Sequence, residues 1–441
     1  MALPCRFMSI DRYNIDAMAT ADKLGIQPTS EVPLKPSPKP RAIELFAGVG
    51  GFRCGIQDWW DVVWSNQWEP STKAQHASDC YVRHFGDANH VCESIEEVLK
   101  KVRAEEMYIP EHDLLTAGFP CQDYSVARTL NQAAGLSGKK GVLWWAIHEV
   151  IFLKQPTFLL LENVDRLLKS PASQRGRDFA VMLSSLADLG YRVEWRVINA
   201  ADYGYAQRRR RVFLVGKKIP KGVDLEDSEG WIQQNGVLPK AFPVVNATPE
   251  NLDRFRLDKD LEVVSDEFGT DRRSSPFQNA GVMQNFQVTT MKVSKLFNDE
   301  GKTLGQILQR PDLVDESFFI DDSEGKWKYL KGPKSIDRTH KGTDTPYTYA
   351  EGGIAYPDPL SNPSRTILTG EGGSSPSRFK HVVEVENGLR RLTPVELERL
   401  NGFPDDWTAE FSDNKRAFLM GNALVVDVVA RIAKVLRSEL N

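Results

Sequence analysis

A tight turn placed directly after a buried strand is the sequence feature that most constrains this chain. Residues 112–117 (HDLLTA) are short and largely apolar, which predicts a buried strand, and Gly118 and Pro120 then end that strand in a turn. Cys121 therefore lies at the carboxyl end of a central strand, the edge at which open α/β sheets bind ligands. A thiol on such a turn is accessible enough to act as a nucleophile, although a lone cysteine is more often a buried structural residue.

Composition and charge exclude several classes of protein. The 441 residues suffice for two or three domains, and the net charge of −4 means that binding to nucleic acid would need a local basic patch. The five cysteines form no C-x-x-C pair, which argues against a disulfide framework or a metal site and for a reducing compartment. We expect neither a signal peptide nor a membrane span, because the apolar runs are too short.

A glycine-rich turn follows the first predicted strand. Residues 42–46 predict that strand, and residues 47–52 (AGVGGF) resemble the turn that follows the first strand of a nucleotide-binding sheet. The pattern is neither G-x-G-x-x-G nor a P-loop, and a purely structural turn explains the glycines equally well. A second strand is predicted over 61–65, and Trp68 beyond its end could stack on a purine or simply pack in the core.

Strand and helix patterns continue to alternate up to residue 216, which predicts an α/β fold. Further strands are expected over 157–161 and 191–199, with another strand ending near 92–95. The polar loop 126–140 exceeds the usual connection length, which suggests a function or mobility. The predicted helices cover residues 71–85, 141–154, 175–189 and 425–440.

Charged side chains are predicted at the ends of two strands. Glu162 follows the strand over 157–161, where a carboxylate is costly unless it has a role or a partner. Residues 208–211 are four arginines that enter the next strand, so Arg209 and Arg211 should share one side of it. A run of charge is usually solvated, but here the strand interior follows at once, so we expect at least one arginine to point into a cleft.

The pattern changes outside this region. Residues 1–40 contain closely spaced prolines, which is typical of an extended linker. From residue 217 to about 388 the periodicity fades, which predicts a second, irregular domain. Regularity returns at Thr393 and Glu396, which form a capping-box pattern with Pro394 at the first helical position.

Six short stretches, in this order, resemble the motifs of the cytosine-C5 DNA methyltransferase family. Each stretch is short, but their common order, with a long variable region before the last two, makes the resemblance specific. Together they span residues 42–429. The stretches are residues 44–51 (ELFAGVGG), 118–122 (GFPCQ), 162–164 (ENV), 207–211 (QRRRR), 391–394 (RLTP) with 402–404 (GFP), and 421–423 (GNA).

The resemblance implies an α/β fold with a Rossmann-like, S-adenosylmethionine-dependent methyltransferase sheet and a second, irregular target-recognition domain. It divides the chain into an N-terminal extension (1–40), a catalytic domain (41–216), a target-recognition domain (217–388) and a C-terminal segment (389–441) that returns to the catalytic domain. Gln67 stands where relatives often have Glu, and Ser94-Ile95 replaces an Asp-Ile pair. The implied cofactor contacts are Phe46, Gly48, Gly50, Gln67, Trp68, Ser94, Ile95, Pro120, Leu143 and Asn422.

The same resemblance implies the chemistry. Cys121 would attack C6 of a cytosine flipped out of the duplex, and Glu162 would bind N3 and the exocyclic amine. Arg211, and secondarily Arg209, would hold the base oxygen and order the Cys121 loop. We expect a monomer without a metal that acts on double-stranded DNA of the nucleoid in a bacterial cytoplasm, with a cognate restriction endonuclease for the same site.

Three alternatives remain open at this point. A tRNA cytosine-C5 methyltransferase shares the same catalytic residues, but the long region 217–388 favours the groove of a DNA duplex. A catalytically dead DNA-binding regulator is disfavoured because Cys121, Glu162 and Arg211 are all present. An NAD-dependent dehydrogenase rests on the glycine turn alone, and the G-x-G-x-x-G pattern is missing.

Overall fold

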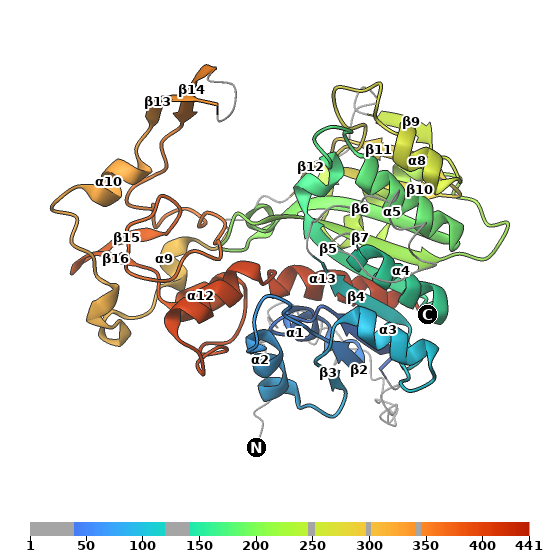
Figure 1. Cartoon of the computed structure of the whole chain (residues 1–441), viewed down its shortest axis with the longest axis horizontal. Coiled ribbons are helices and arrows are strands. Elements are labelled where there is room, and N and C mark those ends of the chain that lie inside the picture. The colour runs from blue at the N-terminus through green and yellow to red at the C-terminus, as the bar shows by residue number, and fades with distance from the viewer. Residues whose placement is uncertain (1–38, 120–141, 246–251, 297–300, 341–344, 441) are drawn as a thin grey trace, which may run out of the picture. The chain divides into compact units, whose positions relative to one another are not determined.

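A ten-stranded mixed sheet forms the centre of residues 40–441 (Figure 1). The computed structural model describes residues 39–119, 142–245, 252–296, 301–340 and 345–440, and it separates residues 1–39 from residues 40–441 as two units. The strand order is β3-β2-β1-β4-β5-β7-β6-β10-β11-β9. The predicted α/β class is therefore confirmed.

The first five strands of the sheet are parallel and diverge from β1. They are β1 (Arg41–Leu45), β2 (Asp61–Asn66), β3 (His90–Val91), β4 (Leu114–Gly118) and β5 (Phe158–Val164). The chain runs outward from β1 to β3 on one side and then restarts with β4 on the other. The boundary between β1 and β4 is thus a topological switch point, where open α/β sheets bind ligands beyond the carboxyl ends of the strands.

Helices cover both faces of the sheet, which is why its strands are apolar on both sides. Leu45 and Leu115 belong to the core beneath α3 (Ile95–Arg103), α4 (Val142–Lys154) and α5 (Arg177–Asp188). Ala42 and Leu114 belong to the opposite core, beneath α1 (Gly51–Ile56) and α13 (Val426–Ser438). This alternation follows the two-residue period of a strand.

The C-terminal helix α13 lies against the start of the sheet. The Trp60 indole Nε1, which precedes β2, donates a hydrogen bond of 3.2 Å to the Ala433 carbonyl. α11 (Pro394–Leu400) begins with the predicted capping box of Thr393 and Glu396, and α12 (Asp413–Asn422) follows it. Residues 389–440 are therefore regular again, as their sequence pattern indicates.

Part of the region expected to be a separate irregular domain extends the sheet instead. β7 (Arg210–Lys218) and β6 (Tyr191–Asn199) run antiparallel, and β10 (Ala280–Gln284) then pairs with β6, followed by β11 (Gln287–Met291) and β9 (Leu252–Arg256). The shorter elements nearby are α2 (His76–Phe85), α6 (Ser228–Gly230), α7 (Val237–Ala241), β8 (Val244–Val245), α8 (Leu261–Glu267) and β12 (Ser294–Lys295).

Residues 301–391 carry only short elements and two small sheets. These elements are α9 (Leu304–Ile307), α10 (Lys326–Lys331), β13 (Lys334–Thr339), β14 (Pro346–Glu351), β15 (Val382–Val385) and β16 (Gly388–Arg391). β13 pairs only with β14, and β15 only with β16, among the described strands. The irregular composition of the sequence corresponds to this segment.

One strand boundary was predicted wrongly. The strand expected to end near residues 92–95 ends at Val91, and Ser94 instead caps α3 by accepting a hydrogen bond of 3.3 Å from the Glu97 amide. Ser94 and Glu97 have the S-x-x-E spacing of a capping box, so the sequence already contained the signal for a helix start.

A buried carboxyl group lies within β1, next to the glycine turn. Glu44 is fully buried, and the Tyr81 hydroxyl donates to its Oε2 over 3.1 Å. Arg53 in turn donates to the Tyr81 hydroxyl over 3.2 Å. Burial, only partly offset by Arg53 and by the Tyr81 hydrogen bond, raises the pKa of Glu44 to about 8.

We expect Glu44→Gln to become more stable relative to the wild type as the pH rises from 5 to 8. Above its ordinary pKa, Glu44 ionises in the unfolded chain but stays protonated in the folded one, so the wild type loses stability until the pH reaches about 8. The difference should grow by at most about 1.4 kcal/mol per pH unit. Urea unfolding at several pH values measures it, with the exposed Asp58→Asn as control. A difference independent of pH would contradict the buried, protonated state.

Candidate active site at the carboxyl ends of β1, β4 and β5

An ion pair joins the ends of β5 and β7. The Arg211 Nε and the Glu162 Oε1 lie 2.9 Å apart, and their side chains are only 19% and 13% exposed. The two strands are antiparallel, with Val164 opposite Arg211, which brings the two side chains together at the carboxyl end of β5. A carboxylate in so sheltered a place needs a partner, and Arg211 supplies it.

The residue after Glu162 holds the end of β4. The Asn163 Nδ2 donates a hydrogen bond of 2.8 Å to the Phe119 carbonyl, and Asn163 is buried. The Glu162 carboxylate also lies close to the end of β4. Its Oε2 is 3.6 Å from the position that a Cβ on Gly118 would occupy. The predicted site residues Pro120 and Cys121 come next in the chain and lie outside the described residues. The structure thus brings Glu162 and Arg211 to the strand end from which the chain enters residue 120.

The four consecutive arginines alternate as the strand pattern predicted. Arg209 is buried and Arg211 is largely buried, whereas Arg208 and Arg210 are exposed. Within the described part of the chain, the Arg210 side chain pairs only with Asp165, in an exposed ion pair of 3.1 Å.

Arg209 contacts backbone rather than the Glu162 carboxylate. It donates to the carbonyls of Ile367 (3.2 Å) and Gly421 (3.0 Å). Burial lowers the pKa of Arg209 to about 9, which still leaves the guanidinium protonated at neutral pH. Arg209 and Arg211 therefore share one side of the strand but have different partners.

The glycine turn after β1 adopts backbone conformations that only some residues tolerate. Gly50 has a φ of +88°, and a Cβ there would lie 2.4 Å from the Phe85 ring, so no larger residue fits without a rearrangement. Gly48 has a φ of +56°, and a Cβ there would meet nothing within 4 Å. Phe46 also has a positive φ, of 54°. The turn therefore exposes backbone on the ligand-binding edge of the sheet.

Gln67 holds this turn from the end of β2. Its Oε1 accepts a hydrogen bond of 2.8 Å from the Gly48 amide, and the side chain is 8% exposed. Trp68, the next residue, is 40% exposed. The adjacent Asn66 donates to the carbonyls of Val91 and Glu93, so it fixes the loop after β3.

The remaining predicted cofactor residues occupy different environments. Ser94 caps α3, and Ile95 is buried in the hydrophobic core that α3, α4 and α5 share. Leu143 is half-buried on α4, and Asn422 is exposed at the end of α12. The turn residues, Gln67 and Trp68 thus lie at the ligand-binding edge, whereas the side chain of Ile95 packs in the core.

Sequence reasoning gave Gln207 and Asn163 no role, although both lie within the recognised motifs. The side-chain Nε2 of Gln207 donates to the Leu400 carbonyl (3.1 Å). Its Oε1 accepts from the backbone amide of Ile367 (3.1 Å). Gln207 is fully buried and therefore links β7 to residues far along the chain. The sequence indicated the importance of Gln207 and Asn163 only by their place inside the motifs, because residue spacing does not reveal distant hydrogen-bond partners.

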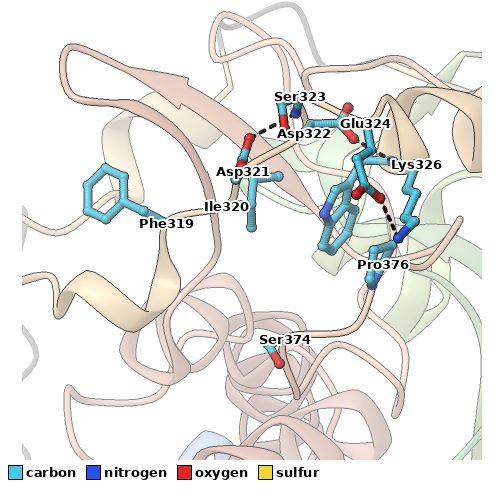
Figure 2. A pocket seen from close by; sticks show the side chains of 10 residues that line it. Phe319, Ile320, Asp321, Asp322, Ser323, Glu324, Lys326, Ser374 and Pro376 are labelled. Carbon is cyan, nitrogen blue, oxygen red and sulfur yellow. Dashed lines mark hydrogen bonds and ion pairs between the residues drawn. The ribbon is translucent and has the colours of Figure 1, made fainter.

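A cavity of about 330 Å³ lies between the segment before α10 and residues 374–376 (Figure 2). Its carboxylates are already bonded: Asp321 accepts from the Ser323 amide, and Glu324 pairs with Lys326. None of the predicted site residues lines it. The lining residues are Phe319, Ile320, Asp321, Asp322, Ser323, Glu324, Lys326, Trp327, Ser374 and Pro376.

Comparison with known proteins identifies the family of this chain. The family model for C-5 cytosine-specific DNA methylases matches residues 41–438. The chain belongs to this family. A DNA methylase assignment also rejects the dehydrogenase alternative.

Individual relatives agree with this family. The Type II methyltransferase M.Sau3AI of Staphylococcus aureus is 48% identical, over 89% of this chain and 94% of its own. M.NgoBI of Neisseria gonorrhoeae is 28% identical, over 90% and 92%. The Dnmt2 methyltransferase of S. pombe has the same fold, with a TM-score of 0.53 and 15% identity over 91% of this chain and 99% of its own.

We expect Arg211→Ala to slow methyl transfer by this methylase far more than Arg210→Ala. Removing Arg211 leaves the Glu162 carboxylate unpaired and deletes a sheltered cation, which should cost a few kcal/mol, or about 10²- to 10³-fold in rate. Arg210 has an exposed pair with Asp165, worth less than about 1 kcal/mol. Single-turnover rates on duplex DNA measure both. Equal losses would show that the alternation of the arginines has no catalytic meaning.

Proposed function

We propose that this chain transfers a methyl group from S-adenosylmethionine to C5 of a cytosine within a specific double-stranded DNA sequence, in a restriction–modification system. The observation that carries the proposal is the sheltered Glu162–Arg211 pair beside the strand end that leads to Cys121. The family match and the 48% identity to a Type II methyltransferase over almost the whole chain support the choice of DNA as substrate.

The residue types suit the chemistry. C5 of cytosine is a poor nucleophile until a thiolate adds to C6, and Cys121 would form this C6–S bond and turn the ring into an enamine. C5 would then take the methyl group as its bond to the sulfonium sulfur breaks, and S-adenosylhomocysteine leaves with the electron pair. Loss of the C5 proton and breakage of the C6–S bond restore the aromatic ring and the free thiolate.

Glu162 and Arg211 would stabilise the ring during this addition. Glu162, held by Arg211, can accept a hydrogen bond from the exocyclic amine of the base, and it would meet N3 through a shared proton, because N3 becomes basic when the thiolate adds to C6. Arg211 would hold the base oxygen. Since C6 is inaccessible within a duplex, the base must be flipped out, and loop 126–140, outside the described residues, remains our candidate for closing over it.

The turn after β1 fits the cofactor in two respects. Its backbone is open at Gly48, where a Cβ would meet nothing within 4 Å, and the turn lacks the Lys-Ser/Thr of a P-loop. The exposed Trp68 could stack on the adenine, and Gln67 holds the turn in place. S-adenosylmethionine would supply an electrophilic methyl group. The other residues proposed to contact it are Phe46, Gly50, Ser94, Ile95, Pro120, Leu143 and Asn422.

The setting of the enzyme follows from the same proposal. It acts as a monomer on duplex DNA of the nucleoid in a bacterial cytoplasm, with a cognate restriction endonuclease for the same sequence. Within the described residues, no helix is both long and apolar enough to cross a bilayer.

Duplex DNA with 5-fluorocytosine in the target site, together with S-adenosylmethionine, should trap a denaturation-resistant complex through Cys121. Fluorine cannot leave C5 as a proton does, so the C6–S bond persists after methyl transfer. Gel electrophoresis and peptide mapping detect the adduct. Cys121→Ser should abolish it, because a hydroxyl ionises far less readily than a thiol, whereas Cys92→Ser should not. An adduct on another residue would overturn the assignment, and tRNA serves as the control substrate.

We further propose that residues 217–388 choose the DNA sequence and that the rest of the chain performs the chemistry. Grafting 217–388 into a related methyltransferase should transfer the methylated sequence, as read by bisulfite sequencing. Because β9, β10 and β11 extend the sheet, a second graft of 301–388 alone tests whether those strands are needed. An active graft that keeps the host's sequence would contradict this division.

A further inference from the structure

The two strands β13 and β14 form a ribbon that carries no core of its own. They pair over six residues each and with no other described strand (Figure 1). Nine of the twelve residues are exposed, on both faces of the ribbon. An isolated two-stranded hairpin is at best marginally stable in water, so this one needs support at its root or contact with a partner.

The root of the ribbon is firmly held. Arg378 donates to the carbonyls of Leu330 (3.1 Å) and Gly332 (3.2 Å) and pairs with Glu351 over 3.3 Å. Lys331, at the end of α10, is fully buried and donates to the Lys380 carbonyl. The support thus lies at one end, and the remaining length of the ribbon is free to contact another molecule.

The two faces of the ribbon differ in chemistry. Strand register places Lys334, Ile336 and Arg338 on the same face as Tyr347 and Tyr349. The opposite face carries small and polar residues. These are Ser335, Asp337, Thr339, Pro346, Thr348 and Ala350, with Thr348 donating to Asp337 over 2.9 Å.

Arg338 has its guanidinium oriented by an aromatic ring on the face that carries Tyr347 and Tyr349. Its guanidinium carbon lies 4.0 Å from the centre of the Tyr349 ring, and across the part of the chain described here it forms no ion pair. Stacking on an aromatic face orients a guanidinium while leaving its outer N–H groups able to donate.

The charge around the ribbon suits DNA. Residues 326–354 contain six lysine and arginine residues against three acidic ones, a net charge of +3 in a chain whose net charge is −4. The major groove, about 12 Å wide, accepts a two-stranded ribbon, and arginine donating to O6 and N7 of guanine is the commonest specific contact there.

We propose that the β13–β14 ribbon enters the major groove of the DNA substrate and that Arg338 reads a guanine there. This rests on the proposed function and goes beyond it by naming the element and the residue that discriminate between sequences. Arg338 is a specificity residue and takes no part in methyl transfer.

The test compares methylation of the wild-type recognition sequence, found by bisulfite sequencing, with that of duplexes carrying each single base-pair substitution. Arg338→Ala should lower kcat/KM on the recognition sequence roughly tenfold or more and abolish discrimination at one G·C pair. Arg338→Lys should keep the charge but not the discrimination, because an ammonium lacks the two-pronged donor geometry. Asp337→Asn, on the opposite face, should leave discrimination unchanged. Thermal melting checks that the exposed substitutions leave the fold intact.

Each other outcome overturns the proposal. If Arg338 contacts only phosphate, Arg338→Ala slows all duplexes equally and Arg338→Lys restores them, with discrimination unchanged. If Asp337→Asn relaxes discrimination while Arg338→Ala does not, the opposite face reads the DNA. If the wild type methylates no duplex, the proposed function is refuted as well. If the wild type is active and Arg338→Ala changes neither kcat/KM nor discrimination, only the proposed role of the ribbon is refuted.

Discussion

The buried guanidinium of Arg209 is the interaction on which the arrangement of the site depends. Its two hydrogen bonds end on the carbonyls of Ile367 and Gly421, so one side chain joins its own segment to two others that lie 158 and 212 residues further along the chain. Gln207, two residues earlier, reinforces the junction through Ile367 and Leu400. A buried cation is costly unless it is hydrogen-bonded, so loss of either carbonyl partner would leave the Arg209 charge less well compensated.

The junction also determines where the Glu162–Arg211 pair lies. Arg211 follows Arg209 by one strand period, so fixing the buried Arg209 aims Arg211 at the end of β5 and at Glu162. Asn163 then connects the same strand end to the Phe119 carbonyl, and Phe119 precedes Pro120 and Cys121 in the sequence. The order of residues within one strand thus couples the buried Arg209 to Arg211, the arginine that we propose acts on the base.

Local patterns explain which parts of this could be predicted. Strand β6, the capping box at Thr393 and the burial of alternate arginines depend on residues close in sequence, and sequence periodicity reveals them. Pairing partners do not follow from such patterns. The strands β9, β10 and β11 were assigned to a separate irregular region, because an edge strand's sequence does not say which sheet it joins. The carbonyl partners of Arg209 escaped prediction for the same reason.

The contrast between the junction and the ribbon bears on how such an enzyme can change its target. Arg209 donates to carbonyls on two distant segments, so we expect a substitution there to disturb the packing beside Arg211. The β13–β14 ribbon buries little, and its support lies at Arg378 and Lys331, at one end. Side chains along its length can therefore change with little cost in folding free energy, since exposed substitutions away from caps and pairs usually shift stability by less than about 0.5 kcal/mol. If the ribbon selects the DNA sequence as we propose, its residues can change while the geometry of the Glu162–Arg211 pair stays fixed.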